Sequence, residues 1–175
     1  MAKDKSSGKS GNELDRSPSH LLHRALQLAL DIYGDEFGPT GLTQRQYAVL
    51  ATVASKEGLT QSDLVSLTGI DRSTLADMAT RMISKGLLAR QKSAVDARAN
   101  AVSLTDAGRA ALEDAQPKMA AADIRLLKRL SGSKRQAFTE LLNALIAAND
   151  KAPKADKPKK TKAEKAAKKK AKKAA

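Results

Sequence analysis

The sequence predicts a mainly α-helical protein that carries one small β-hairpin. Three observations lead to this fold class. Apolar residues recur at helical spacing through most of residues 18–150. Within residues 59–85, two short helical patterns are separated only by a turn at Gly69. Two short strand patterns follow directly, with a polar tip between them. Helix, tight turn, helix and hairpin in this order form the plan of a winged helix-turn-helix.

Positive charge is concentrated at the C-terminal end of the chain. The 175 residues carry a formal net charge of +13. After residue 150 there are twelve lysines against Asp156 and Glu164, so this tail carries +10 and the rest of the chain +3. A strongly basic tail on a nearly neutral body indicates a polyanionic partner, either nucleic acid or an acidic surface.

Composition also excludes several classes of site. The chain has no cysteine, which excludes disulfides, thiolate metal sites and sensing by cysteine oxidation. No apolar run approaches the roughly 18 residues that a membrane span requires, and the N-terminus lacks the apolar core of a secretory signal. We therefore expect a cytoplasmic protein without a membrane partner. His20 and His23 lie one helical turn apart, but no further His or Cys could join them, so we predict no metal site and no cofactor.

The N-terminal arm and the first helix meet at Ser17. Residues 1–17 are rich in Lys, Ser and Gly, and we predict that they are disordered. Ser17 suits the N-cap and Pro18 the first helical position, which predicts a helix from Pro18 to about Asp35. Its apolar residues cover more than one face, so it needs a second surface to pack against, which a second copy of the chain would supply.

Two further helices follow a turn cluster at residues 38–41. Thr43 is placed to cap a helix that ends near residue 57. Thr60 and Asp63 form a loose capping-box pattern at the start of the next helix, which Gly69 ends in a left-handed conformation. The residues of this helix expected to face inward are Leu64, Val65 and Leu67.

The fourth helix runs from an N-cap at Asp71 to Gly86 and has two different faces. At about 100° per residue, five apolar side chains gather on one side. These are Leu75, Met78, Ala79, Met82 and Ile83. The opposite side carries Ser73, Asp77, Thr80, Arg81 and Ser84, with Arg72 and Thr74 in the first turn. Such a face suits base edges and phosphates, although an ordinary solvated helix face has the same composition.

Residues 87–91 and 99–104 are strand candidates, and residues 93–98 form the tip between them. Thr105 caps a long helical stretch over residues 106–130, in which Pro117 is expected to kink or split the helix. A last helix follows residues 131–133, and its apolar stripe contains Phe138, Leu141, Leu142, Leu145 and Ile146. Residues 151–175 contain only Lys, Ala, Pro, Thr, Asp and Glu, and we predict a disordered basic tail.

The chain resembles the MarR family of bacterial transcription regulators over residues 18–150. The most specific part is DRSTLADMATRMISKGLLARQKSAVDARANAVSLTDAG. It contains a Ser-Thr pair near the start of the fourth helix, then Lys85-Gly86-Leu87, Asp96-x-Arg98, Val102-x-Leu104-Thr105 and Gly108. Each fragment is weak alone, and their order and spacing carry the resemblance.

The resemblance implies a homodimer that binds double-stranded DNA. The winged helix-turn-helix would occupy about residues 43–105, and residues 18–37 and 106–150 would form the dimerisation helices. The helix from Asp71 would enter the major groove and Arg98 would approach the minor groove, with Asp96 orienting Arg98 or supporting the wing. Many relatives respond to a small aromatic or phenolic effector, either an acid or its CoA thioester. Asp77 departs from the basic or neutral residue of many relatives, and its carboxylate could accept a hydrogen bond from a cytosine amino group.

These considerations give a set of candidate site residues. The candidates for base contact are Ser73, Thr74 and Asp77, and those for phosphate contact are Thr60, Gln61, Arg72, Arg81 and Arg90, with Arg98 at the wing. A weaker prediction places an effector near Tyr33, Phe37 and Tyr47, which could equally be core residues. The expected function is a ligand-responsive regulator, and a repressor, on a pseudo-palindromic operator.

The sequence also bears on two other function classes, an architectural DNA-binding protein and an enzyme. A winged helix followed by a Lys/Ala/Pro tail also resembles a linker histone, an architectural protein that packages DNA without reading it, but such a protein has no need of long flanking helices. No Gly-x-Ser-x-Gly elbow, His-Glu-x-x-His motif, dinucleotide fingerprint or cysteine nucleophile is present, so we expect no enzyme.

Overall fold

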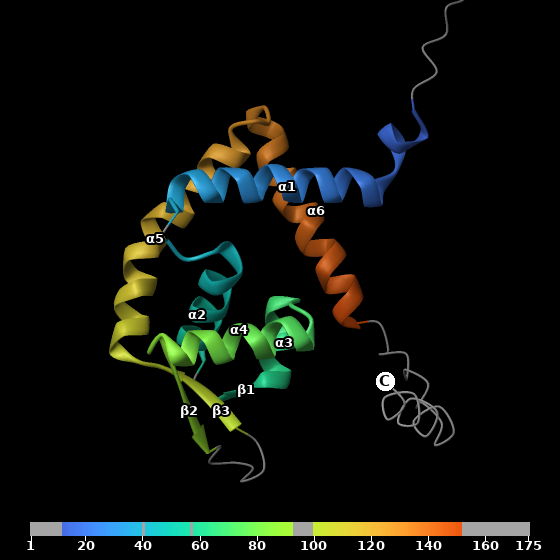
Figure 1. Cartoon of the computed structure of the whole chain (residues 1–175). Coiled ribbons are helices and arrows are strands. Elements are labelled where there is room, and N and C mark those ends of the chain that lie inside the picture. Colours follow the sequence, from blue (N-terminus) through green and yellow to red (C-terminus); the bar gives the residue numbers. More distant parts are fainter. Residues whose placement is uncertain (1–11, 40, 57, 93–99, 152–175) are drawn as a thin grey trace, which may run out of the picture. The chain divides into compact units, whose positions relative to one another are not determined.

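The computed structural model describes residues 12–39, 41–56, 58–92 and 100–151, and the polypeptide divides into two compact units between Leu130 and Ser131 (Figure 1). The first unit contains five helices among the described residues, α1 to α5, and a small sheet. The second contains α6, from Gly132 to Lys151. The predicted tail and Arg98 lie outside the described residues.

Helix α1 spans Pro18–Phe37, two residues beyond the predicted end. Ser17 is its N-cap and Pro18 its first residue, as predicted. Residues Glu13–Arg16 form a short 3-10 helix, η1, capped by Asn12, so the prediction of disorder up to Ser17 is wrong for this segment. The physical reason is local, because the Asn12 side chain accepts a hydrogen bond from the Leu14 backbone amide.

The helix-turn-helix consists of α3, Gln61–Thr68, and α4, Arg72–Ser84. Helix α3 packs against α2, Gln44–Ser55, which begins with a capping box between Thr43 and Gln46. Thr60 and Asp63 form the predicted capping box of α3, and Gly69 follows the helix with φ of 68°. A residue with a Cβ is strained in this left-handed conformation, so glycine permits the short turn into α4.

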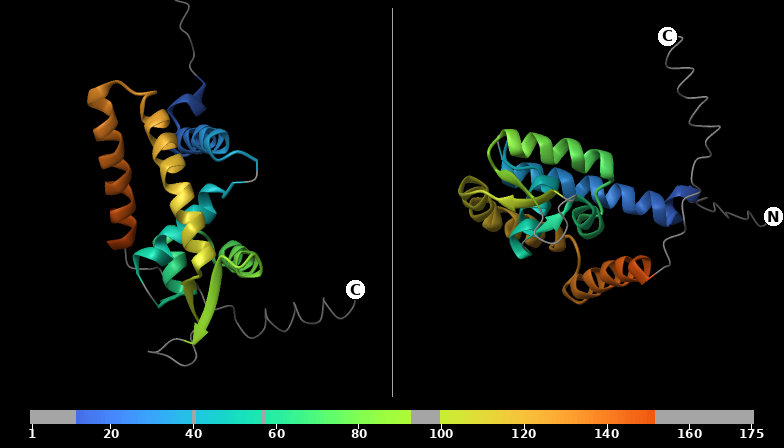
Figure 2. Two further views of the ribbon diagram at one scale, coloured as in Figure 1. Left: turned by 90° about the vertical axis from the view of Figure 1, so that its left-hand side faces the viewer. Right: turned by 90° about the horizontal axis from the view of Figure 1, so that it is seen from below.

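The wing is a three-stranded antiparallel sheet in the order β1-β3-β2. Strands β2, Leu88–Lys92, and β3, Asn100–Leu104, pair from Leu88 opposite Leu104. The sequence did not predict β1, Leu59–Thr60, which adds to β3 with Leu59 opposite Val102. A strand of two residues is too short to show the alternation of apolar and polar residues by which a strand is predicted from sequence. Figure 1 and the left view of Figure 2 show the β2–β3 ribbon extending away from the helices of the first unit.

One apolar core joins these elements. Its most deeply buried large side chains come from α2, β1, α3, α4 and β2, and they are Val49, Leu50, Leu59, Leu64, Leu75, Met82 and Leu88. The predicted inner face of α4 is confirmed, with Ile83 partly buried at its edge. The prediction for Leu67 is wrong, because 60% of its surface is exposed and Ile70, in the following turn, is buried in the core instead.

Helix α5, Asp106–Leu127, begins at the predicted Thr105 cap and continues through Pro117 without a break. Figure 1 shows that it bends along its length, which is the expected effect of a proline inside a helix. It packs against α1 through Arg125, whose Nη2 lies 2.8 Å from Asp35 Oδ2 and whose Nη1 lies 3.2 Å from Glu36 Oε1. These two carboxylates raise the pKa of Arg125.

The described residues contain neither a membrane-spanning helix nor a metal-binding cluster. Across the described ranges, no helix combines the length and hydropathy needed to cross a bilayer. Within the same residues, no three His, Cys, Asp or Glu side chains come close enough together to hold a metal ion.

Candidate nucleic-acid interface

Helix α4 presents a polar face that the core leaves free. Leu75 and Met82 anchor the opposite side at 0% exposure, which fixes the rotation of the helix about its axis. Arg72, Ser73, Asp77 and Arg81 are all exposed, whereas Thr74 is half-buried. The structure therefore places four of the five α4 candidates on a surface that a DNA groove can reach.

The start of α4 is held by its cap. Asp71 Oδ1 accepts hydrogen bonds from the Thr74 amide at 3.0 Å and from Ser73 Oγ at 2.7 Å. Hydrogen bonds from Thr74 and Ser73 hold the pKa of the Asp71 carboxyl well below its usual range. Because the cap orients Ser73, this side chain is fixed before any ligand arrives.

Thr60 serves the fold first. Its Oγ1 donates to Asp63 Oδ2 at 2.7 Å and accepts from the Asp63 amide at 3.3 Å, and these bonds lower the pKa of Asp63. The Thr60 hydroxyl is thus engaged in its own capping box. A phosphate oxygen needs a donor, so Thr60 could contact one only by giving up its hydrogen bond to Asp63, which makes it a poorer candidate than Gln61 beside it.

Gln61 and Arg90 lie together, although 29 positions separate them in sequence. They border a hollow of about 130 Å³ whose other walls are Leu64, Ala79 and Val102. Strand β1 brings the start of α3 beside the wing, and the register sets Arg90 opposite Val102. One neutral donor and one cation at the junction of α3 with the wing suit a phosphate oxygen.

The three aromatic residues predicted to line an effector site make protein contacts. Tyr33 donates a hydrogen bond from α1 to Asp123 on α5. Burial, followed by this hydrogen bond, raises the pKa of the phenol. The rings of Phe37 and Tyr47 meet edge to face with centroids 6.3 Å apart. All three therefore hold α1, α2 and α5 together.

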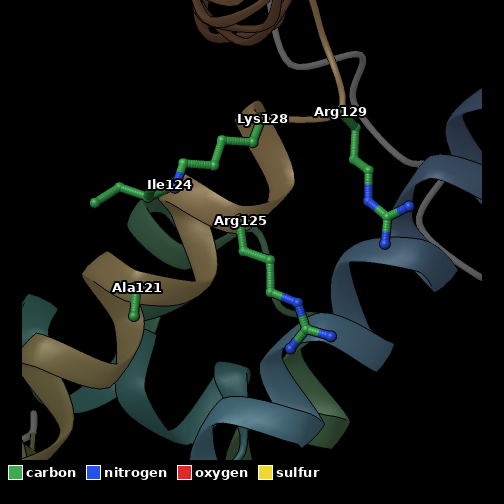
Figure 3. A pocket seen from close by; sticks show the side chains of 5 residues that line it. All are labelled: Ala121, Ile124, Arg125, Lys128 and Arg129. Carbon is green, nitrogen blue, oxygen red and sulfur yellow. The ribbon is translucent and has the colours of Figure 1, made fainter.

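Two larger hollows lie elsewhere in the first unit. One, of about 310 Å³, is enclosed by Leu26 of α1, by Gln44, Arg45 and Ala48 of α2, and by residues 68–71 between α3 and α4. The other, of about 510 Å³, lies at the end of α5 (Figure 3). Its lining is Ala121, Ile124, Arg125, Lys128 and Arg129. Figure 3 shows Arg125 and Arg129 extending toward α1, while Lys128 extends to the other side beside Ile124.

The architecture has counterparts among known proteins. The sequence model of the MarR family matches residues 40–99. The transcriptional regulator HosA of Escherichia coli O111:H- is 36% identical over 107 residues, which cover 61% of this chain and 79% of HosA. The chain belongs to the MarR family. It is accordingly a DNA-binding transcriptional regulator and not an enzyme.

Solved structures show the same fold. BpsR of Bordetella bronchiseptica, whose DNA binding is regulated by 6-hydroxynicotinic acid, has a TM-score of 0.67 at 29% identity over 73% of this chain and 96% of BpsR. The repressor CouR, known from Rhodococcus jostii RHA1, has a TM-score of 0.69 at 28% identity when bound to a 23-mer DNA duplex, over 77% of this chain and 95% of CouR.

Proposed function

We propose that this MarR-family protein is a homodimeric repressor that releases its operator when an aromatic acid or its CoA thioester binds. The observation that carries the proposal is the exposed polar face of α4, rigidly mounted on the core and flanked by the wing. A helix in this setting can enter a major groove while the wing follows the adjacent backbone. CouR, a repressor with this fold bound to DNA, supports the same use here.

Exposed leucines on α1 support the homodimer. Leu21 and Leu22 are 46% exposed, Leu26 is 51% exposed and Leu28 is 41% exposed. In the second unit, α6 exposes Leu141, Leu145 and Ile146 by 57–70%. Several large apolar side chains exposed on one helix are typical of an interaction surface. A two-fold dimer would set two α4 helices about one helical turn of DNA apart, which predicts a pseudo-palindromic operator.

We propose that the effector binds in the hollow between α1, α2 and the α3–α4 turn. It touches α1, a proposed dimerisation helix, and residues 69–71, which set the start of α4. A ligand there would contact both parts whose relative position decides the spacing of the two α4 helices. The Arg45 guanidinium supplies a partner for a carboxylate. The aromatic residues Tyr33, Phe37 and Tyr47 then serve mainly to hold α1, α2 and α5 together.

The effector needs a defined preference for one state. A thousandfold loss of DNA affinity requires it to bind the DNA-free arrangement more tightly by about 4 kcal/mol. BpsR, at 29% identity, responds to an aromatic acid, which supports the chemical class. The hollow at the end of α5, which Ile124, Lys128 and Arg129 help to line, is the competing place for an acidic effector.

An architectural role is the second candidate, because the last 25 residues carry +10 of the net charge. A Lys-rich tail adds affinity that does not depend on sequence, through counterion release. The exposed leucines of α1 argue against packaging as the main function, because a DNA-compacting module has no need of a dimer platform. The tail is better interpreted as a second DNA-binding segment that is less selective for sequence.

The test is to map the binding sites of the full chain across its genome and then measure affinity for the recovered site. A shared pseudo-palindrome bound by a dimer is expected, whereas even coverage without a motif would favour the architectural role. A thermal-shift screen of aromatic acids and their CoA thioesters identifies the effector. Arg45→Ala should then abolish the effector's shift while Lys128→Ala retains it, and the reverse result would move the effector to the end of α5.

A further inference from the structure

On the outward face of α4, the hydroxyl hydrogens are already used within the protein. Ser73 Oγ donates to Asp71 Oδ1 at 2.7 Å, Thr80 Oγ1 to the Ala76 carbonyl at 2.9 Å, and Ser84 Oγ to the Thr80 carbonyl at 3.0 Å. Carboxylate and carbonyl oxygens carry no hydrogen, so the hydroxyl must be the donor in each pair. Each of these side chains therefore offers only lone pairs to a ligand.

Asp77 extends this pattern. Residues 73, 77, 80 and 84 fall within an arc of about 60° around the helix, opposite the buried Leu75 and Met82. All four are exposed. An ionised carboxylate is an acceptor only. We name Ser73, Asp77, Thr80 and Ser84 the acceptor stripe, because the stripe presents acceptors along three turns and no donor.

Cations lie on both sides of the acceptor stripe. Arg72 and Arg81 are exposed, and helical spacing places them on opposite flanks of it. A major groove has the complementary arrangement, with base edges on its floor and phosphates along both walls. The stripe therefore faces the base edges when the two arginines face the phosphates.

We infer that the acceptor stripe selects bases that carry an exocyclic amino group, cytosine N4 or adenine N6, on the strand that it faces. This inference rests on the proposed operator binding and specifies how the operator is read. In the major groove cytosine and adenine present donors, whereas guanine O6 and thymine O4 are acceptors. A side-chain acceptor that faces guanine O6 or thymine O4 finds no hydrogen between the two oxygens, so they repel each other. Inverting a base pair therefore removes the hydrogen bond between the acceptor stripe and the amino group.

Asp77 makes the strongest contact in the acceptor stripe, because charge-assisted hydrogen bonds are stronger than neutral ones. Carboxylates characteristically accept from cytosine N4, so cytosine is the base expected opposite Asp77. Ser73 lies four residues away, about 6 Å along the helix. At about 3.4 Å per base along a strand, Ser73 meets a second amino base about two steps from that cytosine.

The experiment is in vitro selection of binding sites from a randomised duplex library with the full-length protein. We expect cytosine at one position of each half-site and an amino base nearby. Inverting that cytosine–guanine pair should weaken binding about tenfold for the unaltered chain and leave Asp77→Ala almost unaffected. Asp77→Asn should change the selected base from cytosine to adenine, because an amide pairs with adenine N6 and N7.

Glu113→Gln is the matched control, since it removes one negative charge from an exposed position on α5. It should return the motif of the unaltered chain. A motif that stays the same in both Asp77 variants would overturn the acceptor stripe while leaving operator binding intact. Binding without any motif by the unaltered chain would overturn both the stripe and the proposed function.

Discussion

Gly108→Ala tests whether tertiary packing outweighs helix propensity at the junction of α5 with the wing. Gly108 lies in the first turn of α5, where its amide donates to the Thr105 hydroxyl at 3.0 Å. A Cβ at this position would lie 2.0 Å from the Leu87 carbonyl oxygen and 3.2 Å from Leu104 Cδ2. Leu87 is held in place, because its carbonyl accepts from the Thr105 amide at 3.3 Å.

The expected magnitude follows from opposing effects. Alanine gains about 1 kcal/mol over glycine in helix propensity. Overpacking costs about 1–3 kcal/mol, and a contact this short with a backbone atom belongs at the upper end. Displacing Leu87 also weakens its hydrogen bond with Thr105, at about 1 kcal/mol. We expect a net loss of about 2–3 kcal/mol, which lowers Tm by about 4–12 °C for a chain of this size.

Urea and thermal unfolding followed by circular dichroism measure this loss, at one fixed concentration because the protein is proposed to dimerise. Gly34→Ala in α1 is the matched control, since no atom lies within 4 Å of the added Cβ. It should gain up to about 1 kcal/mol. If Gly108→Ala were as stable as the unaltered chain, the close approach of α5 to Leu87 would be wrong.

Four further predictions concern single groups or segments. Arg98→Ala should weaken operator binding and reduce its dependence on salt, and an unchanged affinity across salt concentrations would contradict a DNA contact at the wing. Deleting residues 151–175 should lower non-specific binding and its salt dependence while retaining the operator motif, so loss of the motif would assign specificity to the tail. Tyr33→Phe should lower the free energy of unfolding by about 1 kcal/mol, because it removes the hydrogen bond to Asp123, and an unchanged urea midpoint would argue against that bond. Hydrogen bonds from Thr74 and Ser73 lower the pKa of Asp71 in the folded state. Asp71 should therefore stabilise the fold above the pKa of the unfolded carboxyl, about 4, and this stabilisation should be lost as the pH falls through the lower pKa of the folded state. Asp71→Asn should reduce the acid-induced loss of stability.

Helix beginnings were predicted from sequence because each depends on residues within one turn. Ser17, Thr43, Thr60, Asp71 and Thr105 all act as the N-caps expected of them. The left-handed turn at Gly69 is equally local. Strand β1 escaped prediction because it exists only through its pairing with β3, more than 40 positions later.

The candidate interface divides in the same way. The outward position of Ser73, Asp77 and Arg81 follows from helical periodicity once Leu75 and Met82 are taken as core. The pairing of Gln61 with Arg90, and the close contact of Gly108 with Leu87, could not be predicted, because they bring together segments that periodicity treats separately. Tyr33 illustrates the limit, since its partner Asp123 lies 90 positions away.

The sequence by itself therefore determined the order of helices, their caps, the polar face of α4 and the resemblance to the MarR family, because these depend on short-range backbone geometry and side-chain spacing. Only the tertiary structure decided which segments distant in sequence meet, since it pairs β1 with β3 and sets Gln61 beside Arg90. The local structure of α4 decided what its polar face offers. The hydroxyls of Ser73, Thr80 and Ser84 each donate a hydrogen bond within the protein, so only their acceptor lone pairs remain available toward the solvent. Hydrogen-bond direction depends on where each hydroxyl meets a partner in space, and residue type alone does not specify it.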